Sequence, residues 1–267
     1  MEYFSIDTPS LKASFKEAVI KGLAPDKGLY YPDYIPGLDP RFFDQIESLS
    51  PVEIGLEVMG PFTKDILSKS DLKKVLETVL DFDFPIVPLT DSIGSLELFH
   101  GPTLAFKDVG ARFMAQCLGL FSEGNQAPVT VLVATSGDTG GAVANGFLGV
   151  EGVEVVILYP SGKVSPIQEK QLTTLGQNIQ ALEVDGTFDD CQKMVKTAFL
   201  DPEITDHKQL TSANSIRGGG GGGGGSQVLL LARATATAED ARECTYDKGG
   251  NQSGSLVHIE TEVKSVL

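Results

Sequence analysis

The chain has 267 residues, of which 41% are hydrophobic and 21% are charged, and its formal net charge at pH 7 is -15. This length allows one large domain or two small ones with a sizeable core. The acidic balance argues against nonspecific nucleic-acid binding and against docking on an anionic membrane, because both need a basic face.

The three cysteines lie far apart and form no C-x-x-C pair. The opening MEYFSIDTPS has no basic region followed by an apolar run, so we expect no signal peptide. Both features predict a protein of the reducing cytoplasm. No apolar run approaches the roughly 20 residues that a membrane span needs. The three histidines are scattered, so no metal site is expected.

The first 85 residues show mainly helical patterns. An S-x-x-E capping box at Ser14 and Glu17 predicts a helix over 14–23. A second helix is predicted at Pro51–Met59, and a third is predicted to follow Ser70 with an apolar stripe suited to packing.

After this region, strands and helices alternate. The segment 81–89 contains two prolines and is predicted to be a connection or an edge strand. Further strands are predicted at Leu96–Phe99, Val129–Ala134, Val153–Tyr159, Ile179–Val184 and Gln209–Ser212. Helices are predicted between them at Asp108–Phe121, at about Thr139–Gly149, from Ser165, and at about Phe188–Leu200. Repeated βαβ units imply a parallel sheet covered by helices, so the predicted fold class is α/β.

Four regions are predicted along the chain. Residues 1–85 form the N-terminal region, and residues 86–216 form the α/β region. Residues 217–226 contain eight consecutive glycines, which are typical of a flexible linker. The tail, 227–267, offers one possible helix near Gln227–Arg242 and one possible strand near Ser255–Ile259.

Lys107 lies in the stretch LELFHGPTLAFKDVG, where an apolar run passes through Gly101 and Pro102 before a helical pattern begins. A lysine on such a turn, among apolar neighbours, suits an enzyme that carries an aldehyde cofactor as a Schiff base. Desolvation lowers the pKa of a lysine and makes its neutral, nucleophilic form accessible. The alternative is a solvated lysine that merely flanks a helix.

A second candidate site is the stretch VLVATSGDTGGAVA, in which a strand ends at Thr135-Ser136-Gly137-Asp138-Thr139 and a helix begins. Hydroxyls and exposed N–H groups at a helix N-terminus can bind a carboxylate or a phosphate. The alternative is an ordinary connection with a helix cap.

A third candidate lies in LTSANSI, where a strand leads into Ser212, Asn214 and Ser215. Polar groups at the carboxyl end of a parallel strand often contact ligands, although a plain turn is the alternative.

The sequence does not contain the motifs of three other classes of site. Ser136–Gly141 does not fit G-x-G-x-x-G, the pattern of a dinucleotide-binding site. The Gly-Lys pair at 162–163 does not complete the phosphate-binding P-loop. No G-x-S-x-G occurs, so the sequence gives no support for a serine hydrolase.

Five blocks carry a resemblance to a known family: LELFHGPTLAFKD, ATSGDTGGAVA, VVILYPSGKVSPIQEKQ, LGQNIQALEVDGTFDDCQ and LTSANSI. In this order and spacing they closely resemble the threonine synthase family of the bacterial type. Its members are pyridoxal-phosphate (PLP) enzymes of the tryptophan-synthase-β-like fold. The resemblance covers about residues 1–216, which match only the first half of a family member.

The resemblance implies that Lys107 holds PLP as a Schiff base and moves protons at the α and β carbons of the substrate. O-phosphohomoserine and water would become threonine and phosphate. Four positions match the loop that binds the substrate carboxylate, and two match residues near the leaving phosphate. These substrate-binding positions are Thr135, Ser136, Asp138 and Thr139, and then Asn214 and Ser215.

The chain departs from the family pattern after LTSANSI. Arg217 comes too early to match the family's phosphate-binding arginine, and the family's G-N-F-G loop, which holds the cofactor phosphate, is not found. Two alternatives therefore stay open beside threonine synthase. One is a truncated or frame-disrupted, non-catalytic fragment, and the other is a related PLP phospho-lyase or amino-acid dehydratase. The oligomeric state is left open.

Overall fold

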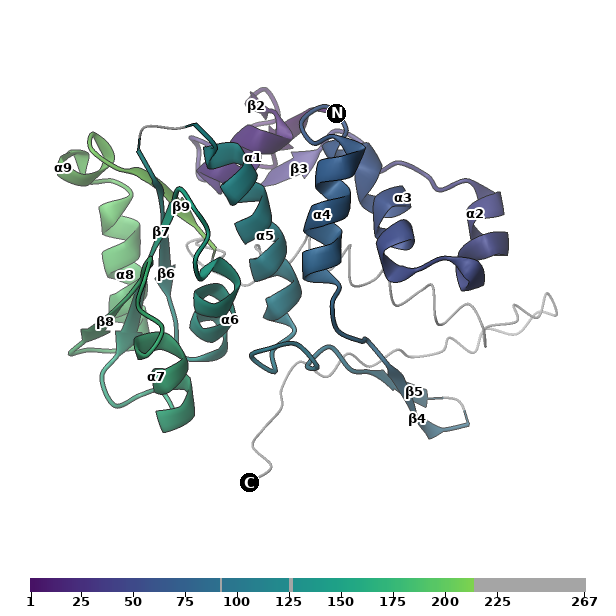
Figure 1. Ribbon diagram of the computed structural model, residues 1–267. Coiled ribbons are helices and arrows are strands. Elements are labelled where there is room, and N and C mark those ends of the chain that lie inside the picture. The colour runs from purple at the N-terminus through teal and green to yellow at the C-terminus, as the bar shows by residue number, and fades with distance from the viewer. Residues whose placement is uncertain (92, 125–126, 214–267) are drawn as a thin grey trace.

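The computed structural model describes residues 1–91, 93–124 and 127–213. A four-stranded parallel sheet with the strand order β8-β7-β6-β9 lies on one side of the molecule (Figure 1). Its strands are β6 (Val129–Ala134), β7 (Val153–Pro160), β8 (Ile179–Val184) and β9 (Gln209–Ser212). The predicted parallel sheet is confirmed, and three strands have the predicted bounds, while β7 extends one residue further.

Helices cover both faces of this sheet (Figure 1). All six residues of β6 are buried, and they alternate between the faces. Val131 belongs to the cluster that contains α5 and α6, whereas Leu132 packs with α8. The helices of this region are α5 (Lys107–Ser122), α6 (Asp138–Phe147), α7 (Pro166–Thr173), α8 (Phe188–Ala198) and the short α9 (Pro202–Thr205).

The strand order contains a reversal. The chain adds β7 and then β8 on one side of β6, and returns to place β9 on the other side. Leu132 of β6 is in register with Ser212 of β9, and the Ser212 hydroxyl donates to the Leu132 carbonyl at 3.0 Å. In open parallel sheets, ligands bind beyond the carboxyl ends of strands at such a reversal. This position is where the second and third candidate sites begin.

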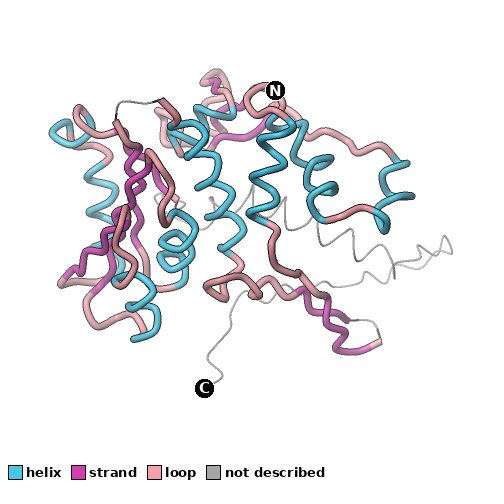
Figure 2. The backbone as a smooth tube through the Cα atoms, in the orientation of Figure 1, coloured by secondary structure: helices cyan, strands magenta, loops and turns pink. Residues whose placement is uncertain are grey.

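The N-terminal region combines helices with a small antiparallel sheet (Figure 2). The sheet contains β1 (Tyr3–Ser5), β2 (Lys12–Ala13) and β3 (Tyr30–Pro32). The helices are α1 (Phe15–Lys21), α2 (Pro40–Gln45), the 3-10 turn η1 (Ile46–Ser48), α3 (Pro51–Thr63) and α4 (Lys69–Val79). A hairpin of β4 (Ile86–Thr90) and β5 (Ile93–Leu96) follows.

Several local predictions are confirmed by the hydrogen bonds of the helix ends. Ser14 caps α1 through a complete capping box with Glu17. Ser165 caps α7 in the same way, with Pro166 at the first helical position. The segment 81–89, predicted to be a connection or an edge strand, runs into the strand β4, which is an edge strand because it pairs only with β5 among the described strands.

Three local predictions are wrong. The strand before the lysine turn ends at Leu96 rather than spanning 96–99, and it belongs to the hairpin rather than to the parallel sheet. The cap of α4 is Ser68, not Ser70, because the Ser68 hydroxyl accepts from the N–H of Asp71. The helix at Pro51 continues past Met59 to Thr63, although it contains Pro61.

One large buried cluster joins side chains from both sides of residue 85, among them Phe15, Leu76, Leu118 and Val131. The N-terminal region therefore shares its core with the α/β region. The boundary near residue 85 and the two later boundaries stay predictions. Asn214, Ser215, the glycine run and the possible elements of the tail lie outside the described residues.

Within the part of the chain that the structure describes, no helix is long and apolar enough to span a bilayer. The same residues contain no group of three or more side chains suited to a metal ion.

Candidate active site

Lys107 is the first residue of α5, and its side chain is half-buried. Its ammonium group lies 5.5 Å from the centre of the Phe106 ring. Burial lowers the pKa of Lys107, and the negative charge of Asp138 opposes this effect. A lysine with a lowered pKa is a better nucleophile near neutral pH, because more of it is uncharged.

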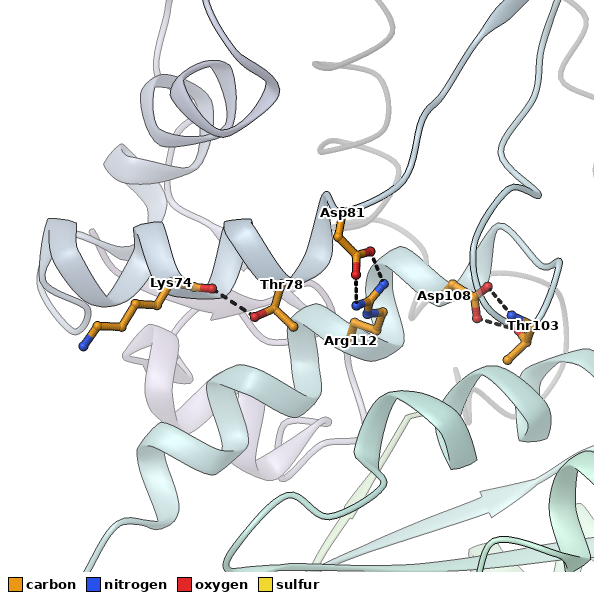
Figure 3. Close-up of polar contacts among 6 residues, drawn as sticks. All are labelled: Lys74, Thr78, Asp81, Thr103, Asp108 and Arg112. Atoms are coloured by element: carbon orange, nitrogen blue, oxygen red, sulfur yellow. Dashed lines mark hydrogen bonds and ion pairs between the residues drawn. The ribbon is translucent and has the colours of Figure 1, made fainter.

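The turn before Lys107 is held by the buried carboxylate of Asp108. This carboxylate accepts from the backbone N–H of Thr103 at 2.9 Å and from the Thr103 hydroxyl at 2.5 Å (Figure 3). Gly101 lies so close that a Cβ there would be 2.5 Å from an Asp108 oxygen. Leu104 has a φ of 59°, which is uncommon for a residue other than glycine. The tight turn therefore depends on this carboxylate.

In the second candidate site, Thr135 forms hydrogen bonds with the backbone of its own loop. Its buried hydroxyl accepts from the N–H of Gly137 at 3.0 Å and from the N–H of Gly140 at 2.8 Å, and it donates to the carbonyl of Gly137 at 3.1 Å. Gly137 itself has a φ of 148°, a backbone conformation that side chains disfavour. The Thr135 hydroxyl thus shapes the connection between β6 and α6.

Ser136 and Thr139 differ from Thr135, because their hydroxyls make no hydrogen bond within the described residues. Ser136 is exposed and Thr139 is partly exposed. Both belong to the N-terminal end of α6, where the first N–H groups of a helix lack intrahelical acceptors. Asp138, the first residue of α6, accepts from the side-chain amide of Gln168 at 2.6 Å.

The helices α5 and α6 pack closely against each other. A Cβ on Gly146 of α6 would lie 3.1 Å from the backbone of Ala111 and Arg112 in α5. The negative charge of Asp138 also raises the pKa of Lys107 against the larger effect of burial, so the two side chains interact electrostatically. Lys107 and Asp138 thus influence each other although a full helix and strand separate them in the sequence.

Comparisons with known proteins identify the relatives of this chain. Residues 2–79 match the family described as threonine synthase N terminus, and residues 95–223 match the family described as pyridoxal-phosphate dependent enzyme. A threonine synthase from Serratia marcescens is 44% identical over 216 residues, which are 81% of this chain and 50% of that protein. The chain belongs to the threonine synthase family, over the N-terminal half of its members. It spans about half the length of the curated relatives that it matches.

Two solved threonine synthases show the same fold. The Escherichia coli structure has a TM-score of 0.76 at 40% identity, covering 91% of this chain and 54% of that one. The PLP-bound Brucella melitensis structure has a TM-score of 0.81 at 35% identity, covering 90% of this chain and 52% of that one. The predicted α/β fold of the PLP-enzyme type is confirmed for this half.

The sequence motifs did not reveal three side chains that hold parts of the site in place: Thr103, Asp108 and Gln168. Gln168 completes the capping box of α7, and its second contact, with Asp138, joins residues 30 positions apart. No local sequence signal reports a contact of that range. An acidic residue directly after the lysine is visible in the sequence, but its burial is not.

Proposed function

We propose that this chain carries the lysine-bearing half of a threonine synthase that converts O-phosphohomoserine and water to threonine and phosphate with pyridoxal phosphate. The observation that carries the proposal is the half-buried Lys107 with a lowered pKa, whose amine interacts electrostatically with Asp138 at the N-terminal end of α6. The family membership of the matched half supports the same reaction.

The residues present fit the cofactor through the chemistry of Lys107. Its amine can form a covalent bond with an aldehyde, and its lowered pKa favours the uncharged form that does so. Pyridoxal phosphate, when bound, supplies an electron sink for charge that develops on the substrate carbons. The amine of Lys107, once released by substrate, is the base and acid that moves protons at the α and β carbons.

The N-terminal end of α6 suits the substrate carboxylate. The hydroxyls of Ser136 and Thr139 are available there, and the helix dipole favours an anion. Thr135 has a different role in this site: its hydroxyl accepts from backbone N–H groups of the loop and fixes the shape of the loop. Asn214 and Ser215 come two and three residues after the end of β9 in the sequence, and by family resemblance we assign them to the leaving phosphate.

Covalent attachment of the cofactor tests the proposal. The full chain is mixed with pyridoxal phosphate, the visible absorbance is recorded, and the adduct is reduced with borohydride for peptide mass spectrometry. We expect the label on Lys107 and its loss in Lys107→Ala, while Lys193→Ala, which removes an exposed lysine of α8, keeps it. Labelling spread over surface lysines would contradict the role of Lys107 and favour a non-catalytic fragment.

A product assay separates the reactions that the same lysine can serve. Release of phosphate and formation of threonine from O-phosphohomoserine are expected. Ammonia release from serine or phosphothreonine, without threonine formation, would instead favour the related phospho-lyase or dehydratase.

A further inference from the structure

Gln168 uses both ends of its side-chain amide. Its carbonyl oxygen accepts from the backbone N–H of Ser165 at 3.2 Å, which completes the capping box of α7. Its amide nitrogen donates to Oδ1 of Asp138 at 2.6 Å. One side chain therefore fixes the start of α7 and also holds a carboxylate at the start of α6.

The loop before α6 is built to admit this contact. A Cβ on Gly137 would lie 2.4 Å from the Gln168 amide nitrogen, so the amide crosses directly over the glycine. With a φ of 148°, Gly137 has a backbone conformation open to glycine and disfavoured for other residues. The close approach restricts where the amide, and with it the Asp138 carboxylate, can lie.

Asp138 and Lys107 interact without pairing. The Asp138 charge raises the pKa of Lys107 against the larger effect of burial. Yet no ion pair joins the two side chains among the residues that the structure describes. A direct ion pair would hold the amine in its charged form, which cannot attack an aldehyde.

We propose that Gln168 is a positioning residue that holds the Asp138 carboxylate away from the Lys107 amine and so keeps the amine able to react. The inference rests on the proposed role of Lys107. It adds a residue from a third helix to a site formed by the N-terminal ends of α5 and α6.

Several charged groups close to Lys107 in the sequence have other partners. Asp108 is engaged by Thr103, and Arg112, one turn further along α5, is paired with Asp81 at 2.5 Å. The segment before the turn contributes His100 and Glu97, which bond to each other at 2.6 Å. Asp138 differs from these groups, because a single substitution at Gln168 removes the hydrogen bond that holds its carboxylate.

The test measures the reactivity of Lys107 in the cofactor-free full chain. Competitive labelling with acetic anhydride across a pH series, read by peptide mass spectrometry, gives the pKa of Lys107 relative to the exposed Lys193. In Gln168→Met we expect Asp138 to pair with Lys107, to raise the pKa of Lys107, and to slow its labelling at pH 8 by about threefold or more. Gln168→Asn, whose shorter side chain retains an amide, serves as a second variant with the same expectation.

Two controls separate positioning from helix capping. Ser165→Ala removes the capping hydroxyl of α7 but leaves the Gln168 amide, so Lys107 labelling should match the native chain. In an Asp138→Asn background, adding Gln168→Met should change nothing, because the carboxylate that it would release is gone.

Unchanged or faster Lys107 labelling in Gln168→Met would overturn the inference, as would equal slowing in the Asp138→Asn background. Both outcomes are independent of the proposed function, because no cofactor is present. Failure of cofactor attachment to the native chain, with the labelling pattern intact, would reject the function and keep the positioning role.

Discussion

Asp108 accepts two hydrogen bonds from Thr103, five residues earlier, and the carboxylate that receives them is 1% exposed (Figure 3). Because Lys107 lies between the two residues, this contact closes the turn that presents the lysine. The bonds are charge-assisted, and such bonds are stronger than neutral ones.

Thr103→Val should destabilise the chain by about 2 kcal/mol, because it removes the hydroxyl donor and leaves a buried carboxylate oxygen without that partner. Urea unfolding measures the change in the free energy of unfolding. Thr103→Ser is the matched control, since it keeps the hydroxyl and should cost well under about 1 kcal/mol. Equal losses in both variants would show that the methyl group of Thr103, not its hydroxyl, stabilises the turn.

Gly137→Ala should destabilise the chain by more than about 2 kcal/mol, since it combines a disfavoured backbone conformation with a steric clash against Gln168. The control is Gly162→Ala. Gly162 also has a positive φ, 63°, but nothing lies within 4 Å of the added Cβ, so only the conformational cost of about 1–2 kcal/mol remains. Thermal unfolding compares the two, and a loss in Gly137→Ala no larger than in Gly162→Ala would contradict the clash.

The central strands β6 and β7 could be predicted from the sequence because they are largely apolar and are bounded by glycine or proline. The strands of the N-terminal sheet could not, since β1, β2 and β3 have only two or three residues each, too few to show an alternating pattern. The helix α2 carries an Asp39 cap and Pro40, which are valid start signals, but none of its residues is buried, so no apolar stripe revealed it.

The chemistry of the site was also unevenly predictable. Lys107 and the loop at Asp138 stand out locally, because a turn followed by a helix is a local pattern. Their proximity depends on the packing of α5 against α6, and the bond from Gln168 depends on the position of α7. Such contacts come from tertiary structure, and family resemblance can imply them where local patterns cannot.

Asp81 and Arg112 form a two-bond ion pair that joins the end of α4 to α5 (Figure 3). Arg112 also lies over the Phe82 ring. The hydrogen bonds from Arg112 lower the pKa of Asp81. A carboxylate with a lowered folded-state pKa stabilises the fold above its unfolded pKa of about 3.9, and this contribution is lost as pH falls through the folded value.

Asp81→Asn should therefore lower the free energy of unfolding at pH 7 by up to about 1 kcal/mol, a small value because the Asp81 side chain is 50% exposed. The difference from the native chain should shrink toward zero in acid, as followed by urea unfolding across pH. Glu77→Gln, which breaks an exposed pair with Lys73 within one helix, provides the control and should change stability less. A difference that persists below pH 2 would rule out the ion pair as its cause.

Lys107→Met should stabilise the chain at neutral pH, although it removes the residue proposed for catalysis. Burial lowers the pKa of Lys107 in the folded state, so the unfolded chain holds the proton more tightly. Protonated Lys107 thus costs stability at every pH below its folded pKa, and the cost disappears as pH rises from that value toward the unfolded pKa of about 10.4. Removing such a group from an active site commonly gains about 0.5–2 kcal/mol.

The gain from Lys107→Met should be greatest at pH values below the folded pKa of Lys107 and should decrease steadily as pH rises from there toward the unfolded pKa of about 10.4, when measured by urea unfolding of the cofactor-free chain. Lys193→Met, at an exposed position of α8, should change stability by no more than about 0.5 kcal/mol at any pH. A loss of stability in Lys107→Met at pH 7 would mean that the contacts of the lysine, including its position over the Phe106 ring, outweigh the cost of its buried charge. A gain that does not vary with pH would point to apolar packing of the methionine instead.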